Sequence, residues 1–309
     1  MGTGGKQMTI GQALKWGKNE LAQAGIEESE YESAVLLSDV LERPRLDMLL
    51  DKHSEINEGQ MRRFDAFIRR RAAHEPLQYI EGKTEFMGFP FYVSPDVLIP
   101  RADTEILCET ALRLLPQNAS VFDLGTGSGA IAVSLAALRR DLLVTAGDIS
   151  PAAIEIAKRN AEKNGVKIEF VLGNCLEPVS QLRYDMIVSN PPYISEEERK
   201  TLSLEVLNEP ELALFDGGDG LSFYRTITDA AQHVLAENGI LLFEIGWKQA
   251  HAVGAMLEER IGTPFFVKDY GGNWRVAGAA RQEKAIETLK KKSELVVHVG
   301  QIGLDTSSL

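Results

Sequence analysis

Cysteine and histidine are scarce in this sequence of 309 residues. The two cysteines, Cys108 and Cys175, form no C-x-x-C pair, and the five histidines are scattered without the spacing of metal ligands. Disulfide frameworks and cysteine zinc sites need more numerous or more closely spaced cysteines. We therefore expect neither a structural disulfide nor a bound metal.

Long hydrophobic runs are also missing. No stretch reaches the roughly 18 uncharged apolar residues of a membrane-spanning helix. The opening MGTGGKQMTI lacks the apolar centre of a signal peptide. Apolar residues nevertheless make up 44% of the chain, enough for a core and, at this length, for two domains. The sequence predicts a soluble protein of the cytoplasm, with no membrane partner.

Positive charge is in deficit. The chain has 45 acidic and 33 basic residues and a formal net charge of −12, which repels polyanions. Its most basic segment, MRRFDAFIRRR at 61–71, is interpreted as the solvated face of a helix. The composition therefore argues against a direct nucleic-acid partner.

The chain changes character along its length. Helical periodicity with few strand signals predicts a small all-helical domain over 1–76. Aromatic and β-branched residues punctuated by Gly and Pro predict a β-hairpin linker over 77–97. A larger domain follows over 98–281, and 282–309 form a C-terminal extension to which we assign no role.

The larger domain alternates strand and helix patterns, which indicates an α/β fold with a mostly parallel, Rossmann-like sheet. Two more strand-like runs flank the tight-turn sequence YGGN, so the expected sheet has seven strands and the last is antiparallel. The first five predicted strands are 120–125, 142–148, 167–173, 184–190 and 239–246.

A glycine-rich loop follows the first predicted strand. In DLGTGSGA, Gly125, Thr126, Gly127, Ser128 and Gly129 lead from a buried strand into a helix, whose free N–H groups favour ligand binding. The spacing also satisfies the dinucleotide pattern G-x-G-x-x-[G/A]. The loop alone does not distinguish an S-adenosylmethionine site from a nicotinamide dinucleotide site.

Asp148 ends the next predicted strand, 23 residues beyond Gly125, where a carboxylate can bind ribose hydroxyls. The alternative is that it caps the helix starting at Ser150 and Pro151. Two features favour S-adenosylmethionine over a nicotinamide cofactor. The glycine loop follows a helical domain, and the fourth strand ends in NPPY, which hydride transfer does not require.

The NPPY stretch predicts a clamp for a planar NH₂ group. Pro191 and Pro192 fix the backbone, so the Asn190 side chain and the Pro191 carbonyl stay directed into the crevice beyond the strand ends. Two acceptors that hold the amino hydrogens favour a pyramidal, nucleophilic nitrogen, and Tyr193 offers a surface for stacking. An activated sulfonium needs no strong general base beside it.

These residues resemble the peptide chain release factor N5-glutamine methyltransferases, the HemK or PrmC family. The similarity covers about 75–281 through EPLQYIEGKTEFMGFPFYVSPDVLIPRADTE, DLGTGSGAIA, SNPPYI, NEPELALFDGGDGL and DYGGNWRV. It implies a class I methyltransferase domain and transfer of a methyl group from S-adenosyl-L-methionine to a glutamine. The target would be the Gly-Gly-Gln glutamine of class 1 release factors, which the helical domain would help to bind.

The resemblance also assigns roles to individual residues. It places the cofactor loop at Gly125 to Gly129, the ribose carboxylate at Asp148, and the catalytic amide clamp at Asn190 to Tyr193, with Asn190 also near the methionine part of the cofactor. Where many members have an acidic residue and an aromatic, this chain has Asn174 and Cys175, so we expect adenine contact there with less stacking.

Several alternatives remain at this stage. In LIPRADTE, the residues Arg101, Asp103 and Glu105 fit either a charged network at the cofactor mouth or structural salt bridges. The NPPY signature is shared with N6-adenine nucleic-acid methyltransferases, although no basic, base-flipping domain is evident. A non-catalytic binding module is the third hypothesis. The sequence does not determine the oligomeric state, and we favour a monomer.

Overall fold

The computed structural model describes residues 8–282 and 297–300. The chain divides into two compact units. One is helical and contains the chain up to Gly82 together with Ser203–Asn208. The other contains Lys83–Leu202 and the chain from Glu209 onward.

The helical unit is built on two well-capped helices. At the start of α1, Thr9 and Gln12 exchange side-chain and backbone hydrogen bonds, and Asn57 and Gln60 do the same at the start of α4. A core of buried apolar side chains, including Leu21, joins the helices. The helices are α1 Ile10–Gln23, α2 Ser29–Leu41, α3 Arg45–Leu50, α4 Glu58–Ala72, α5 Leu77–Glu81 and α9 Leu204–Leu207.

A buried arginine attaches the segment Ser203–Asn208 to this unit. Arg71, at 5% exposure, pairs with Glu32 and, through Nη2 at 3.1 Å, with Oε1 of Glu205. The Asn208 side chain donates to the His74 carbonyl at 3.0 Å. In the basic segment 61–71, Arg62, Arg63 and Arg69 are solvent-exposed, as interpreted from the sequence, whereas Arg70 is half-buried and Arg71 is buried.

The second unit contains the predicted α/β sheet. Its described strands run in the order β10-β8-β9-β7-β6-β3-β4-β5, and β9 is antiparallel to both of its neighbours. The strands are β3 Ser120–Leu124, β4 Leu143–Asp148, β5 Glu169–Leu172, β6 Tyr184–Ser189, β7 Leu235–Glu244, β8 Thr263–Lys268, β9 Trp274–Ala280 and β10 Val297–Val299. The sequence predicted seven strands, and the short β10 from the C-terminal extension adds an eighth at the edge.

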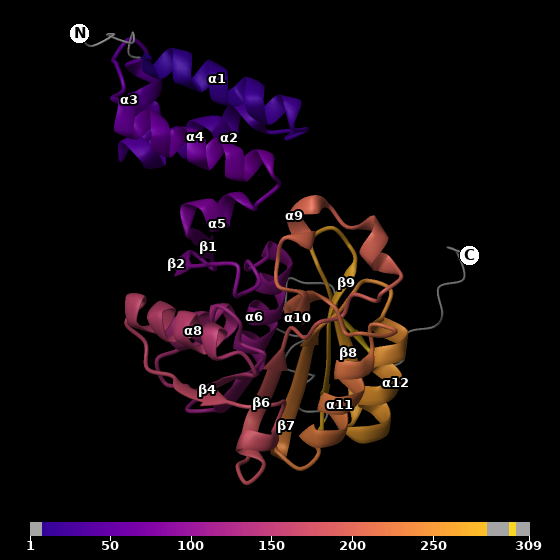
Figure 1. The fold of residues 1–309 in the computed structure, drawn as a ribbon. Helices are drawn as coiled ribbons and strands as arrows, with labels where there is room; N and C mark the ends of the chain where they lie inside the picture. The colour runs from indigo at the N-terminus through magenta and orange to yellow at the C-terminus, as the bar shows by residue number, and fades with distance from the viewer. Residues whose placement is uncertain (1–7, 283–296, 301–309) are drawn as a thin grey trace, which may run out of the picture. The chain divides into compact units, whose positions relative to one another are not determined.

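Helices cover both faces of the sheet. Neighbouring residues of β3, Val121 and Phe122, enter two separate apolar clusters, as expected for a sheet buried on both sides. Figure 1 shows α8 on one side and α11 and α12 on the other. The helices and 3₁₀ turns of this unit are α6 Ala102–Leu114, α7 Ala130–Leu138, α8 Pro151–Lys163, η1 Glu177–Val179, η2 Glu198–Thr201, α10 Glu211–Leu214, α11 Ser222–Ala231 and α12 Ala250–Arg260.

The predicted linker differs in detail from the structure. The hairpin is formed by β1 Lys83–Phe86 and β2 Phe89–Tyr92, whereas the start of the predicted range 77–97 is the short helix α5. The units separate after Gly82, because α5 packs with the helical unit through the buried Ile80.

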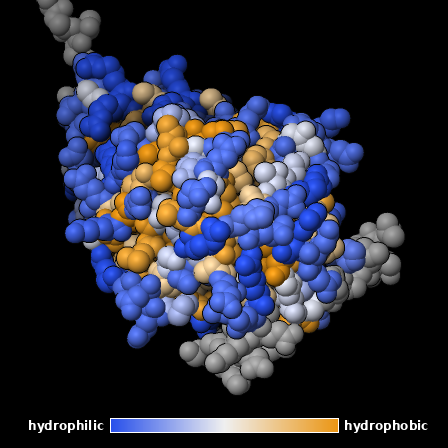
Figure 2. Space-filling view, turned by 90° about the horizontal axis from the view of Figure 1, so that it is seen from below, coloured by the Kyte–Doolittle hydropathy of each residue, from blue (hydrophilic) through white to orange (hydrophobic). Residues whose placement is uncertain are grey.

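The surface is mixed in polarity. Figure 2 shows one face on which hydrophobic residues gather in an area bordered by hydrophilic ones. Exposed apolar side chains are common on folded proteins. Across 8–282 and 297–300, we find no helix with the length and apolar character needed to cross a bilayer.

Candidate functional site

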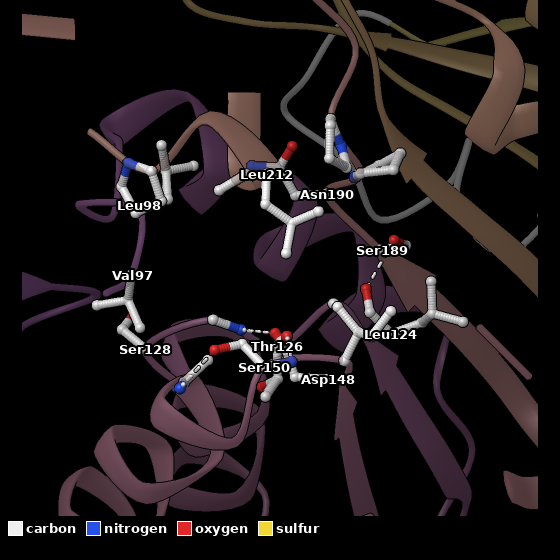
Figure 3. A pocket seen from close by; sticks show the side chains of 18 of the residues that line it. Val97, Leu98, Leu124, Thr126, Ser128, Asp148, Ser150, Ser189, Asn190 and Leu212 are labelled. Carbon is white, nitrogen blue, oxygen red and sulfur yellow. Dashed lines mark hydrogen bonds between the residues drawn. The ribbon is translucent and has the colours of Figure 1, made fainter. Parts of the chain in front are cut away.

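A cavity of about 470 Å³ lies where β3, β4 and β6 end. The carboxyl ends of parallel strands form the ligand-binding edge of such sheets. Figure 3 shows Val97 and Leu98 on one side of the cavity and Leu124 and Asn190 on the other. Ten of the predicted site residues border it: Gly125, Thr126, Gly127, Ser128, Asp148, Asn174, Cys175, Asn190, Pro191 and Pro192. Gly129 and Tyr193 are not part of its lining.

The glycine loop leaves room for a ligand. Gly125 and Gly127 have φ angles of +74° and +54°, and a Cβ built on either would meet no atom within 4 Å. Gly129 has a different role. Its φ is +81°, and a Cβ there would lie 3.1 Å from Cβ of Ala157, so its small size lets α7 begin close to α8.

Asp148 fastens the loop from the next strand. One carboxylate oxygen accepts from the Gly127 N–H and the other from the Ser150 N–H, both at 2.9 Å. Ser150 itself caps α8 by accepting from the Ala153 N–H at 3.2 Å. Asp148 is therefore not the helix cap, and it borders the cavity at the predicted ribose position.

Asp123 supports the glycine loop from within the core, and the sequence reasoning missed it. It is fully buried, and its Oδ2 accepts from the Thr126 hydroxyl at 2.6 Å and from the Ala132 N–H at 3.1 Å. Burial raises the pKa of this carboxyl to about 7. Its place next to the last residue of β3, two residues before Gly125, was the available signal.

The Asn190 side chain is held from one end. Its Nδ2 donates to the Thr104 hydroxyl at 3.2 Å, and no residue within the described ranges donates to its Oδ1. The Pro191 carbonyl also accepts no hydrogen bond from that part of the chain. Two neighbouring acceptors beside the cavity thus keep their lone pairs available.

Tyr193 is anchored behind this pair. Its hydroxyl donates to Oε1 of the buried Glu244 at 3.2 Å, and its carbonyl accepts from the Gln249 side chain at 3.0 Å. Burial, and next the charge of Glu244, raise the pKa of the Tyr193 hydroxyl above its usual value, which keeps it a donor. The sequence reasoning did not include Glu244, which belongs to an ordinary apolar strand pattern.

The charged residues of LIPRADTE do not form one network. Arg101 pairs with the buried Glu209, and Glu105 accepts from the Met87 N–H at 2.6 Å. Asp103 lies 3.0 Å from Nη2 of Arg275. The structure therefore favours structural contacts over a charged network at the cofactor mouth.

The cavity fits a cofactor of the S-adenosylmethionine type. The loop offers open space above two glycines, and Asp148 offers carboxylate oxygens for a diol. Asn174 and Cys175 follow β5 at the adjoining strand end. Within the described residues, no group of three or more His, Cys, Asp or Glu side chains is placed to hold a metal.

Comparison with known proteins identifies the family. The family model described as PrmC N-terminal domain matches 12–82, and the methyltransferase small domain matches 102–223. The release factor glutamine methyltransferase of Geobacter sulfurreducens is 42% identical over 87% of this chain and 96% of that protein. The chain belongs to the release factor glutamine methyltransferase family. Its Bacillus subtilis relative is 44% identical over 79% of this chain and 88% of that protein.

Membership of the release factor glutamine methyltransferase family confirms the predicted fold class and S-adenosyl-L-methionine as cofactor. Among solved structures, a Pyrococcus furiosus methyltransferase has a TM-score of 0.49 at 19% identity, covering 63% of this chain and 89% of that one. The Thermus thermophilus 16S rRNA N2 G1207 methyltransferase has a TM-score of 0.48 at 20% identity, covering 65% of this chain and 50% of that one. The family assignment rests on the sequence relatives.

Proposed function

We propose that this enzyme transfers a methyl group from S-adenosyl-L-methionine to the side-chain amide nitrogen of the glutamine in the Gly-Gly-Gln motif of class 1 release factors. One observation carries the assignment of the reaction to NPPY. Asn190 and Pro191 are consecutive residues that line the cavity, and no described residue donates to Asn190 Oδ1 or to the Pro191 carbonyl. A primary amide presents two N–H donors, which match this pair.

The two acceptors orient the substrate nitrogen. A carboxamide nitrogen is a weak nucleophile because its lone pair is delocalised into the carbonyl. Hydrogen bonds to both amino hydrogens favour a pyramidal nitrogen, and they strengthen as positive charge develops there. Pro192 restricts the backbone behind them, and the ring of Tyr193 provides a flat surface for the amide plane.

Other residues hold the methyl donor in this proposal. When bound, S-adenosyl-L-methionine supplies a methyl group on a positively charged sulfur, which makes the carbon electrophilic. The loop from Gly125 to Gly129 would lie against it, because Gly125 and Gly127 leave open space there, and Asp148 would accept from its ribose hydroxyls. Asn174 and Cys175 would hold the adenine, and Asn190 would also contact the methionine part.

No strong base is required, because the nitrogen loses its proton after it becomes cationic. The residues therefore act by orientation and by placing acceptors. The proposed partner is a protein without direct nucleic-acid contact, which suits the net charge of −12. Because that partner works in translation, we place the enzyme in the cytoplasm, as a monomer.

The test is mass spectrometry of a class 1 release factor after incubation with enzyme and cofactor. We expect the gain of one methyl group on the Gly-Gly-Gln glutamine and none in a Gln→Ala substrate. Asn190→Ala should lower kcat by about 100-fold or more, the scale of losing a transition-state acceptor. Methylation of adenine in duplex DNA, with none on the release factor, would refute the proposal.

A further inference from the structure

We propose that Thr104 and Glu244 are positioning residues that fix the side-chain amide of Asn190 with its oxygen toward the substrate. This inference rests on the proposed function, in which Asn190 Oδ1 accepts from the glutamine amide. An asparagine side chain is nearly symmetric in shape, so packing alone does not decide which of its ends faces the cavity. Something must select the orientation.

The selecting contacts form a short chain. Glu244 ends β7 and is 1% exposed, and Thr104 lies in the first turn of α6 and is 4% exposed. The Thr104 hydroxyl donates to Oε2 of Glu244 at 2.6 Å, and its oxygen accepts from Asn190 Nδ2 at 3.2 Å. Strand β7, helix α6 and the end of β6 thereby meet through three side chains.

Proton counting sets the direction of this chain. An ionised carboxylate only accepts, and a threonine hydroxyl has a single hydrogen. The short bond to Glu244 uses that hydrogen, so Thr104 can offer Asn190 nothing but a lone pair. Asn190 must therefore donate through its NH₂ group, because a reversed amide would place its oxygen next to the Thr104 oxygen with no hydrogen between them. Its Oδ1 is left facing away from Thr104.

Burial raises the pKa of Glu244, while its hydrogen bonds from Thr104 and Tyr193 and a nearby cation oppose this by favouring the ionised form. Its other oxygen accepts from the Tyr193 hydroxyl at 3.2 Å, so both oxygens act as acceptors. The guanidinium of Arg275 adds a nearby positive charge. This positive charge is itself placed by contacts with Asp103 at 3.0 Å and Asp269 at 3.2 Å.

The test compares isosteric and conservative substitutions at Thr104. Thr104→Val removes the hydroxyl at nearly constant volume, so Asn190 can turn freely between its two orientations. We expect kcat for release factor methylation to fall by about 10- to 100-fold, the scale of one hydrogen bond to a charged or reacting group. The Kd for S-adenosyl-L-methionine should stay within about twofold, and Thr104→Ser should restore most of kcat.

A matched control lies on the same helix. Thr110 is fully buried and its hydroxyl donates to the Ile106 carbonyl at 2.7 Å, so Thr110→Val removes a comparable bond away from Asn190. We expect its kcat to equal that of the wild type. Equal losses in Thr104→Val and Thr110→Val, or an unchanged kcat in Thr104→Val, would overturn the inference.

A readout independent of activity is the NMR signal of the Asn190 side-chain NH₂ in asparagine-labelled enzyme. In the wild type, the hydrogen directed at Thr104 should exchange slowly with solvent, and Thr104→Val should abolish this protection. In Glu244→Gln, the new amide can donate to Thr104, which frees the hydroxyl to donate to Asn190 Oδ1. Protection should then fall as well.

The NMR result also separates the two proposals. Protection that is present in the wild type and lost in Thr104→Val supports the positioning role, even if no release factor is methylated. Absence of protection in the wild type, or its survival in Thr104→Val, refutes the positioning role, even if the release factor is methylated normally.

Discussion

Replacing Asp148 by Asn tests the assignment of the cofactor's ribose to the end of β4. In the structure, the two carboxylate oxygens already accept from the N–H groups of Gly127 and Ser150. Each oxygen has a further lone pair for a hydroxyl at the cavity. Asn keeps one oxygen and replaces the other with a donor, which faces a backbone N–H and cannot accept from the ribose.

The expected loss follows from the contacts removed. A hydrogen bond to a charged group contributes about 1.5–3 kcal/mol. The substitution removes the charge and at least one such bond to the ligand, so the Kd for S-adenosyl-L-methionine should rise about 10- to 100-fold. The effect belongs to cofactor binding, and saturating cofactor should recover most of kcat.

The assay is calorimetric titration of Asp148→Asn with S-adenosyl-L-methionine. Glu155→Gln is the matched control, because it removes one negative charge from the exposed face of α8, where Glu155 pairs with Lys158. The control should bind like the wild type. A rise of less than about threefold in Asp148→Asn would refute the reasoning, because it is smaller than the loss of even one weak charged hydrogen bond.

The remaining predictions concern stability. The pKa of Asp123 is raised to about 7 in the folded protein, so the folded state gains stability at low pH and loses it as pH rises through 7. Between pH 6 and 8 the free energy of unfolding should fall by about 1 kcal/mol, and Asp123→Asn should lack this component in urea titrations. Arg71→Met leaves Glu32, whose side chain is only 13% exposed, without its partner, and should destabilise the helical unit by about 3–5 kcal/mol in urea. A change as small as that of the exposed Arg62→Met would contradict it. Tyr193→Phe keeps the proposed stacking ring but leaves Glu244 short of a donor, so unfolding free energy should fall by about 1–3 kcal/mol while methyl transfer persists. Loss of transfer without loss of stability would contradict that reasoning.

Features encoded by local backbone requirements were predictable from the sequence. The glycine loop needs residues that adopt positive φ, and NPPY needs a rigid strand end, so both appear as short patterns. The structure places these two motifs beside the same cavity. Strand positions followed from apolar runs, although β7 begins at Leu235, earlier than the predicted 239.

Features that depend on tertiary pairing were not predictable. Glu244 has no local mark, because its importance comes from Thr104 and Tyr193, which are distant in the sequence. Arg101 and Asp103 are separated by one residue in LIPRADTE, yet their partners are far apart in the sequence. A single sequence shows which side chains are charged, but it does not show which of them meet.

The attachment of Ser203–Asn208 to the helical unit limits how this protein can be dissected. The chain enters that unit twice, first from its beginning and again between the NPPY stretch and Glu209. A truncation that starts at Lys83 would remove the ion pair between Arg71 and Glu205 and the hydrogen bond from Asn208 to the His74 carbonyl. In such a fragment, Ser203–Asn208 would lack its packing partners only ten residues beyond Tyr193. The isolated α/β unit is therefore a poor substitute for the intact enzyme in assays.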